Sequence, residues 1–243
     1  MKVFSNRSLL ITRPLQDSVV LSEQIKKLDA TINVICSPLF EIENLTINYD
    51  LSRINGLIIT SANAVRSLER SKVKFDGPMF CVGNSTAFLA KRAGYRSVSS
   101  NGNTSQLFEL IKNSVSGNYE KLIYFRGEEI IGDLGAALRA KSYNVEEVIC
   151  YRKLPNDFSK NTIDGIKDNL IIGATFFSKE TVRLFYGQVK YIPDDFVAFC
   201  ISKEVSKTIL AFYPKSPISV RVAKEPTMCE MCKLIVAAQE FAV

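Results

Sequence analysis

The chain has 243 residues and a formal net charge of +6, and 47% of its residues are hydrophobic and 23% charged. This length allows one large domain or two domains of about 100 residues each, and the hydrophobic content excludes a largely disordered chain. The chain contains no histidine, which excludes Ser-His-Asp and Cys-His catalysis. Its apolar runs are shorter than the roughly 20 residues of a membrane span, and its start, residues 1–7, is too polar for a signal peptide. We therefore expect a cytoplasmic protein without a membrane partner.

Short apolar runs alternate with segments of helical periodicity along the chain. The runs predict strands at residues 8–12, 33–36, 56–60, 79–82, 121–125, 145–151, 171–177, 196–201 and 219–223. The periodic segments predict helices at residues 17–28, 62–70, 85–93, 105–114, 131–142, 180–186, 203–212 and 228–238. Near-continuous apolar strands that alternate with helices are typical of doubly wound parallel sheets, so we expect an α/β fold.

Two strand–helix junctions share one design, which indicates an internal duplication. Residues 57–66 and 174–183 each end an apolar run in a serine, Ser61 and Ser178, and place Val-Arg four and five residues later. These serines lie 117 positions apart (178 − 61). Two further strand-end pairs have similar separations: Cys81 with Cys200 (119 positions) and Arg13 with Arg126 (113 positions). Three pairs at nearly constant separation predict two related α/β lobes with a ligand site between them.

Two extended-looking segments fall between the repeated units. Residues 38–43 and 145–151 partly alternate polar and apolar side chains and do not run on into a helix. We expect them to be the two crossings between the lobes, paired with each other. The chain would then leave the first lobe near Cys36 and return to it near Pro155.

Polar groups gather where the predicted strands end. In an open α/β sheet, ligands bind outside the carboxyl ends of the strands, where helix N-termini offer amides to carboxylates or phosphates. The side chains and turns at these ends are Arg13, Thr60, Ser61, Asn63, Gly83, Thr86, Arg126, Gly127 and Ser178. We expect them to bind an anionic small molecule. Each hydroxyl or amide side chain could instead be a helix N-cap, and each arginine could form a structural ion pair.

The sequence gives little sign of a cofactor or metal. It contains neither GxGxxG nor GxxxxGK[ST]. Cys81, Cys150 and Cys200 lie in or beside apolar runs, which predicts that they are buried free thiols. Cys229 and Cys232 form one CxxC on a predicted helix, a weak metal signal without a second pair. The basic residues are dispersed, so we expect no nucleic-acid partner. The sequence shows no apolar seam through which two copies could associate, so we expect a monomer.

Seven short motifs follow one another along the chain: Thr12-Arg13-Pro14, Thr60-Ser61-x-Asn63-Ala64-Val65, Val82-Gly83-x-x-Thr86-Ala87, Arg126-Gly127, Tyr151, Phe176-Phe177-Ser178 and Ala223-x-x-Pro226-Thr227. In this order and spacing they resemble the uroporphyrinogen-III synthase family over nearly the whole chain. One turn departs from the family pattern. Where the family usually has Gly-x-Thr-Thr-Ala, this chain has residues 202–206 (SKEVS), so substrate contacts are not carried over to that turn.

The resemblance implies two flavodoxin-like lobes with parallel sheets, joined by a two-stranded β-ladder. Lobe 1 would combine residues 1–35 and 156–243, the ladder residues 36–51 and 139–155, and lobe 2 residues 52–138. The implied activity is that of a cofactor-independent lyase of haem biosynthesis, which cyclises hydroxymethylbilane to uroporphyrinogen III with inversion of ring D and loss of water. The resemblance also adds Ala64 to the substrate-binding residues.

Tyr151 is the best candidate for the acid that assists departure of the substrate hydroxyl. A phenol with a pKa near 10 is protonated at pH 7 and can donate a proton. The alternative is a strand tyrosine that packs at a hinge. We expect Ser61 and Ser178 to face each other across the site, with the first copy of the module and residues 82–87 holding more of the substrate.

Two other functions fit the same residues. One is a two-lobed cytoplasmic protein that binds small anions, and the other is a degenerate, regulatory synthase-like protein. The altered turn at residues 202–206 motivates the second of these. Analysis of the isomers formed from hydroxymethylbilane separates all three.

Overall fold

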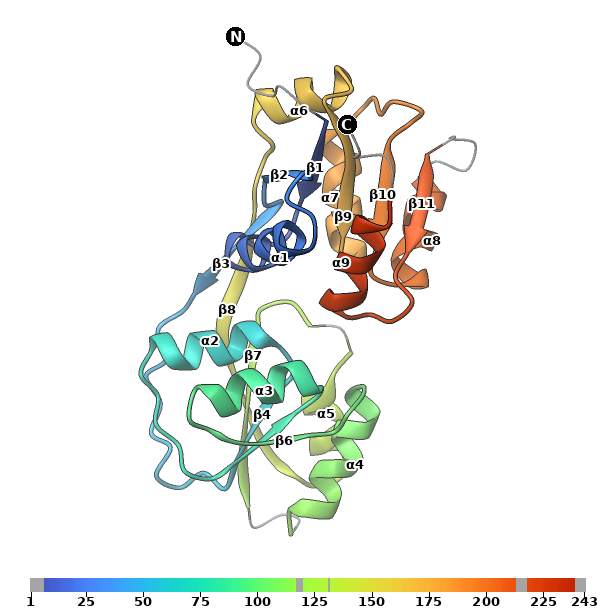
Figure 1. Cartoon of the computed structure of the whole chain (residues 1–243). Coiled ribbons are helices and arrows are strands. Elements are labelled where there is room, and N and C mark those ends of the chain that lie inside the picture. Colours follow the sequence, from blue (N-terminus) through green and yellow to red (C-terminus); the bar gives the residue numbers. More distant parts are fainter. Residues whose placement is uncertain (1–6, 117–119, 131, 213–217, 239–243) are drawn as a thin grey trace. The chain divides into compact units, whose positions relative to one another are not determined.

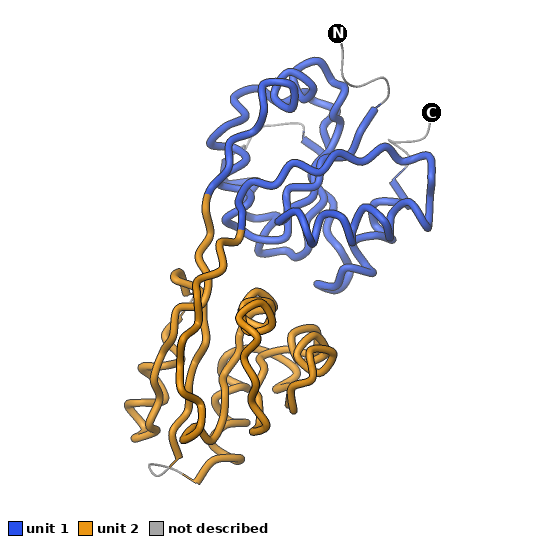
Figure 2. The backbone as a smooth tube through the Cα atoms, turned by 90° about the vertical axis from the view of Figure 1, so that its left-hand side faces the viewer, with its two compact units in different colours: residues 1–41, 155–243 blue, residues 42–154 orange. Residues whose placement is uncertain are grey.

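The computed structural model of the chain describes residues 7–116, 120–130, 132–212 and 218–238 (Figure 1). Contacts divide it into two compact units, coloured separately in Figure 2: unit 1 is residues 1–41 and 155–243, and unit 2 is residues 42–154. The chain passes from one unit to the other twice, in β3 (Phe40–Asn44) and in β8 (Asn144–Pro155). The lobe and ladder boundaries proposed from the sequence stay a prediction. Residues 1–6, which carry most of the signal-peptide argument, lie outside the described residues.

Unit 1 is built on a five-stranded parallel sheet with the order β11-β10-β9-β1-β2. Its strands are β1 (Ser8–Ile11), β2 (Asn33–Cys36), β9 (Ile171–Phe176), β10 (Val197–Cys200) and β11 (Ser219–Val222). The three central strands are buried along their whole length, because helices cover both faces of the sheet. Helix α1 (Leu15–Leu28) packs on α9 (Met228–Val236), α7 (Lys179–Gln188) packs on α8 (Lys203–Phe212), and α6 (Lys160–Lys167) packs on β9.

Unit 2 has a six-stranded sheet with the order β3-β8-β7-β4-β5-β6. Five strands run parallel: β4 (Gly56–Ile59), β5 (Pro78–Cys81), β6 (Arg96–Ser99), β7 (Lys121–Gly127) and β8. Strand β3 runs antiparallel to β8, since the Leu45 amide donates to the Cys150 carbonyl (3.0 Å) and the Asn156 amide to the Leu39 carbonyl (2.9 Å). The predicted crossings at residues 38–43 and 145–151 thus overlap two strands that pair with each other.

Alternating side chains of β4 divide the core of unit 2 into two layers. Leu57 and Ile59 pack with α2 (Ala62–Arg70) and α3 (Asn84–Arg92) on one face of the sheet. Ile58 packs on the other face with α4 (Thr104–Ser114) and α5 (Leu134–Arg139). This is the expected consequence of the two-residue period of a strand that is buried on both sides. The predicted α/β fold with parallel sheets is confirmed.

The strand orders show how the two units are related. Counted along the chain within each unit, unit 1 has the flavodoxin order 2-1-3-4-5, whereas the parallel strands of unit 2 have the order 3-2-1-4-5. The two orders coincide when unit 1 is counted from β9, so that β9, β10 and β11 correspond to β4, β5 and β6. Strands β1 and β2 then correspond to β7 and β8. The two sheets are circular permutations of each other, which supports the duplication.

The three sequence pairs fall on corresponding strands of this permuted arrangement. Ser61 and Ser178 follow β4 and β9, and Cys81 and Cys200 end β5 and β10. Arg13 follows β1 and Arg126 lies in β7, so in this pair the unit 1 residue comes first in the chain. The nearly constant separation therefore does not come from two copies that simply follow each other along the chain. In the third pair the unit 1 residue comes first, whereas in the other two pairs the unit 2 residue comes first, because two strands of unit 1 precede the inserted unit 2.

One strand and one helix were not predicted from the sequence, and another helix is shorter than predicted. Strand β6 and helix α6 were not expected, since both are polar and lie at the surface. Helix α5 is shorter than the predicted 131–142. It starts after Asp133, whose side chain accepts a hydrogen bond from the Ala136 amide (2.7 Å), and it cannot reach Ser142, which has a positive φ of 65°. Residue 131 lies outside the described residues.

The cysteines confirm the expectation of buried thiols. Cys81, Cys150 and Cys200 are fully buried, and burial raises their pKa from the ordinary value of 9.0 to about 12. In the CxxC, Cys229 is exposed, whereas Cys232 is buried and its thiol contacts the Gln24 side-chain oxygen at 3.6 Å. Within the described ranges, no group of three or more His, Cys, Asp and Glu side chains is placed to hold a metal ion. None of the described helices is long and apolar enough to cross a lipid bilayer.

We expect thiol reagents to distinguish the exposed cysteine from the three buried ones. At pH 8 the raised pKa lowers the thiolate fraction of Cys81, Cys150 and Cys200 about a thousandfold relative to an ordinary cysteine (12 − 9 = 3 pKa units), and burial blocks access further. Timed alkylation with mass spectrometry should label Cys229 first and these three only after denaturation. The variant Cys229→Ser should lose the fast phase. Equal labelling of Cys200 and Cys229 in the native protein would contradict the burial described.

Candidate functional site

The parallel register of unit 2 brings most of the predicted site residues to one edge of the sheet. Ile59, the last residue of β4, lies opposite both Cys81 of β5 and Phe125 of β7. The turns that follow these strands therefore stand side by side at the carboxyl edge. The last residues of β7, these turns and the first turns of α2 and α3 carry the predicted residues Thr60, Ser61, Asn63, Ala64, Gly83, Thr86, Arg126 and Gly127.

Thr60 forms a hydrogen-bonded pair with a residue that the sequence analysis missed. Its hydroxyl lies 2.9 Å from the hydroxyl of Tyr124 in β7. The Tyr124 side chain is only 4% exposed, and burial is the main reason that its pKa is raised above the ordinary value. One signal could have identified it: Tyr124 precedes Arg126 by two residues in a strand, so the two side chains lie on the same face.

Arg126 is held by a carboxylate and by backbone carbonyls. Its Nε donates to Glu147 Oε2 at 2.5 Å, and its Nη1 donates to the carbonyl oxygens of Gly127 (2.8 Å) and Glu128 (3.2 Å). Arg139 of α5 shares the same carboxylate, with Nη1 2.7 Å from Glu147 Oε1. Two guanidinium groups around one carboxylate leave a net charge of +1 beside β7 and β8, with Arg126 nearer the carboxyl edge and Arg139 nearer the start of β8. The structural ion pair considered from the sequence is thus present, and Glu147 is a second residue that the sequence analysis missed.

Gly127 makes room for the ring of Tyr151. The two residues lie opposite each other in neighbouring strands, after an irregularity in the ladder between β7 and β8. A Cβ atom at Gly127 would lie 2.7 Å from Tyr151 Cζ and 2.9 Å from its hydroxyl oxygen. The Tyr151 side chain is 7% exposed and packs in the same cluster as Ile59 and Ala64. The packing therefore fixes the phenol at the carboxyl end of β7.

Three predicted residues at the start of α2 have structural hydrogen bonds. The Ser61 hydroxyl accepts from the Asn63 amide (3.1 Å), as an N-cap does. Asn63 Oδ1 accepts from Arg66 Nη1 at 2.9 Å. Ala64 donates its amide to the Ser61 carbonyl (3.1 Å), and its methyl group is fully buried. The capping role considered from the sequence is present at Ser61.

Helix α3 begins without a side-chain cap. Its N-cap is Gly83, whereas α2, α4 and α5 of the same unit are capped by Ser61, Asn103 and Asp133. The φ of Gly83 is an ordinary −142°, and a Cβ atom there would meet nothing within 4 Å, so neither strain nor space requires glycine. Its absent side chain leaves the first amides of α3 open to an anion. Thr86 lies in this first turn but is buried.

The predicted residues of unit 1 also lie at the carboxyl edge of their sheet. Arg13 follows β1, donates to Asp17 Oδ2 at 2.9 Å and stacks over Phe177, with its guanidinium carbon 4.1 Å from the ring centroid. Ser178 follows β9 and caps α7, because its hydroxyl accepts from the Thr181 amide at 3.1 Å. In the altered turn at residues 202–206, the Ser202 hydroxyl accepts from the Val205 amide at 3.4 Å.

Comparison with known proteins identifies the family. A family model described as uroporphyrinogen-III synthase HemD matches residues 19–233, which is most of the chain. The chain belongs to this family. The resemblance inferred from the motifs is therefore confirmed. None of the curated protein sequences compared with the chain matches it significantly.

Two solved structures show that the fold is shared with this family. Uroporphyrinogen-III synthetase from Helicobacter pylori aligns with a TM-score of 0.64 at 16% identity, over 95% of this chain and 99% of that one. A mutant uroporphyrinogen III synthase from Thermus thermophilus aligns with a TM-score of 0.53 at 14% identity, over 93% of this chain and 96% of that one. At such identities the likeness concerns the fold.

We predict that Gly127→Ala destabilises the protein. The new methyl group would overlap the Tyr151 ring, and such overpacking typically costs about 1–3 kcal/mol, which lowers the melting temperature by several degrees. Gly187→Ala is the matched control, because this helical glycine of α7 has open space around it and alanine favours the helix. Differential scanning fluorimetry should show a lower Tm for the first variant and an equal or higher Tm for the second. Equal Tm values for Gly127→Ala and the unchanged protein would refute the close approach.

Proposed function

We propose that the chain catalyses the cyclisation of hydroxymethylbilane to uroporphyrinogen III, with inversion of ring D and loss of water, in haem biosynthesis. The observation that carries this proposal is the family match over residues 19–233. The edge of unit 2 supports it, since it offers hydroxyl groups, the Arg126 guanidinium and the uncapped start of α3 to a ligand with many carboxylates. We further propose that the reaction is that of a lyase and needs neither metal nor cofactor.

The chemical task is mainly one of positioning. Hydroxymethylbilane closes spontaneously to the wrong isomer, so the enzyme must favour attack by the substituted carbon of ring D on the carbon that loses its hydroxyl. For ring D to be inverted, the bond from this substituted carbon to its bridge to ring C must then break and re-form at the other α-carbon of ring D, which loses its hydrogen as a proton. Rigid donors serve this purpose well because their geometry is set before the substrate arrives. The amides at the start of α3 are fixed by the helix, and the Thr60 hydroxyl is fixed by Tyr124. We propose that these groups, with Arg126, bind substrate carboxylates.

Tyr151 is the proposed proton donor. As the C–O bond of the hydroxymethyl group breaks, the phenol proton passes to the departing oxygen, which leaves as water. The proton released when the closed ring regains its double bonds returns to the phenolate, so the enzyme ends unchanged. Two observations support Tyr151: a phenol is protonated at pH 7, and packing over Gly127 fixes the ring at the carboxyl edge. Substrate binding by Arg13, Ser61, Asn63, Ala64, Thr86, Gly127 and Ser178 stays a prediction.

The first functional test is the isomer pattern formed by Tyr151→Phe. Freshly made hydroxymethylbilane is supplied, and the products are oxidised and resolved by chromatography. The unchanged protein should shift the product from isomer I to isomer III, and Tyr151→Phe should slow formation of isomer III by about 10²-fold, the lower end of acid catalysis, because positioning persists. Tyr95→Phe is the control, since this buried tyrosine donates to the Val73 carbonyl (2.7 Å) and directly precedes β6, at the edge of the sheet opposite the carboxyl ends.

Two outcomes would decide against parts of the proposal. Full activity of Tyr151→Phe would exclude the acid role and leave the synthase function standing. An unchanged protein that yields isomer I alone would exclude the synthase function and favour the anion-binding or degenerate alternative, for which the altered turn at residues 202–206 is the motive. The cytoplasmic location, the monomeric state and the absence of a nucleic-acid partner stay predictions.

The second test adds the missing cap to α3. Gly83→Ser places a hydroxyl where it can accept from the first amides of the helix, so it should leave Tm unchanged or slightly raised while it competes with the substrate for these amides. We expect the KM for hydroxymethylbilane to rise about tenfold. Gly83→Ala is the matched control, because it adds a similar bulk without an acceptor and should raise KM less. Equal KM values for the two variants would argue against substrate binding by the open amides.

A further inference from the structure

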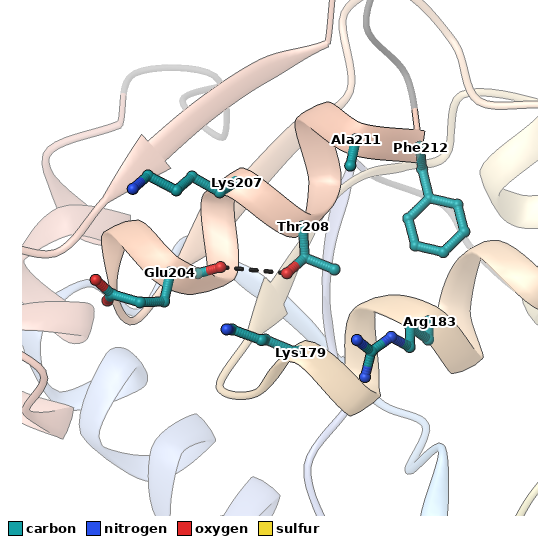
Figure 3. A pocket seen from close by; sticks show the side chains of 7 residues that line it. All are labelled: Lys179, Arg183, Glu204, Lys207, Thr208, Ala211 and Phe212. Carbon is teal, nitrogen blue, oxygen red and sulfur yellow. Dashed lines mark hydrogen bonds between the residues drawn. The ribbon is translucent and has the colours of Figure 1, made fainter.

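A pocket of about 460 Å³ opens between α7 and α8 of unit 1 (Figure 3). Its lining residues are Lys179, Arg183, Glu204, Lys207, Thr208, Ala211 and Phe212. The first two come from α7, and the other five come from successive turns of the facing side of α8. The pocket is thus a groove between two packed helices, and none of its lining residues is among those that the sequence analysis predicted.

The pocket has an excess of positive charge. Three cations and one carboxylate give a net charge of +2 (3 − 1). In the described part of the chain, Lys179, Arg183 and Lys207 have no ion-pair partner within 4.0 Å, in contrast to Arg126 and Arg139, which share Glu147. Hydrogen bonds from its own amide and from Ser202, together with the nearby Lys207 and Lys179, lower the pKa of Glu204, so this carboxylate is charged at pH 7. This single carboxylate does not neutralise the three cations of the pocket.

The polar end of the pocket lies beside the carboxyl ends of two central strands. Lys179 directly follows Ser178, the cap of α7 after β9, and Glu204 belongs to the altered turn after β10. Ligands of open α/β sheets bind at this edge. The other end carries the apolar side chains: Ala211 and Phe212 lie two turns further along α8, on the side of the pocket where Arg183 lies (Figure 3), and the Phe212 ring, which is 47% exposed, stacks on Tyr186 with centroids 5.4 Å apart. A ligand with an anionic group and an apolar body matches this gradient.

We propose that this pocket is a substrate subsite, in which Lys179, Arg183 and Lys207 bind carboxylate arms of the linear tetrapyrrole and Phe212 contacts its apolar body. The inference rests on the proposed function. In unit 2 the uncapped α3 offers backbone amides to carboxylates, whereas the turn at residues 202–206 lacks the glycine and threonines usual in the family. In the α7–α8 pocket, side-chain cations would bind carboxylates through charge-assisted hydrogen bonds, the role that backbone amides have at the start of α3.

The test removes two pocket charges and compares the result with an equal charge change elsewhere in unit 1. Lys179→Met/Lys207→Met is the pocket variant, and Lys160→Met/Lys167→Met is its control, because both control lysines are exposed on α6. Initial rates of isomer III formation should show a KM about tenfold higher in the pocket variant, with kcat within twofold of the unchanged protein. Loss of binding that is equal in ground state and transition state changes KM in this way. The control variant should keep both constants within twofold.

A variant that raises the positive charge of the pocket, instead of lowering it, makes the test independent of damage to the fold. Glu204→Gln raises the net pocket charge from +2 to +3, so the KM should fall about two- to threefold. A merely structural Glu204 would not give tighter binding. The KM of the pocket variant should also rise less steeply with salt than that of the unchanged protein, because fewer charges take part in binding.

Three results would overturn the inference. If the pocket variant and its control have equal KM values while the unchanged protein makes isomer III, the subsite is wrong and the proposed function stands. If the unchanged protein makes no isomer III, the proposed function fails and the subsite fails with it. If titration calorimetry shows that inorganic phosphate binds the unchanged protein and not the pocket variant, and KM is the same in both, the pocket is a site for free anions and not for substrate.

Discussion

Burial of both faces of two parallel sheets is the constraint on which the other features depend. A strand such as β4, with every residue buried, lies between two layers of helices, and a helix that returns the chain after a strand makes the next strand parallel to it. Their carboxyl ends consequently meet at one edge. Hydroxyl, guanidinium and amide groups from distant parts of the sequence gather there without any requirement for contacts between the turns themselves.

The two units treat positive charge at this edge differently. In unit 2, Glu147 bridges Arg126 and Arg139, so an arriving carboxylate must share these cations with a carboxylate already present. In unit 1, no carboxylate of the described residues lies within 4.0 Å of the cations of the α7–α8 pocket to bridge them in this way, and Glu204 lines the pocket beside them. The first arrangement favours a fixed geometry, because each guanidinium is held in place. The second leaves long side chains that can adapt to a ligand, at a greater cost in side-chain entropy.

The sequence predicted those parts of the fold that depend on local pattern. Fully apolar runs such as residues 56–59 identified the central strands, whereas β6 was missed because an edge strand needs only one buried face. The site was predicted less well. Tyr124 and Glu147 reach their partners through the register of parallel strands, which a single sequence does not reveal. A single sequence also does not reveal the permuted order of the strands, since equal separations along the chain do not show which member of each pair belongs to which unit.

The circular permutation has a consequence for synthesis of the chain. Unit 2 is one continuous segment, residues 42–154, so all of its strands are available before the later part of unit 1 is made. Unit 1 is different, because β1 pairs on one side with β9 and cannot be buried until residues beyond 170 have left the ribosome. The apolar strand β1 must therefore wait, paired at most with β2, while the whole of unit 2 is translated. Domains fold as units during synthesis, so the inserted unit has the earlier opportunity to fold, and the unit that contains both chain ends completes its sheet last.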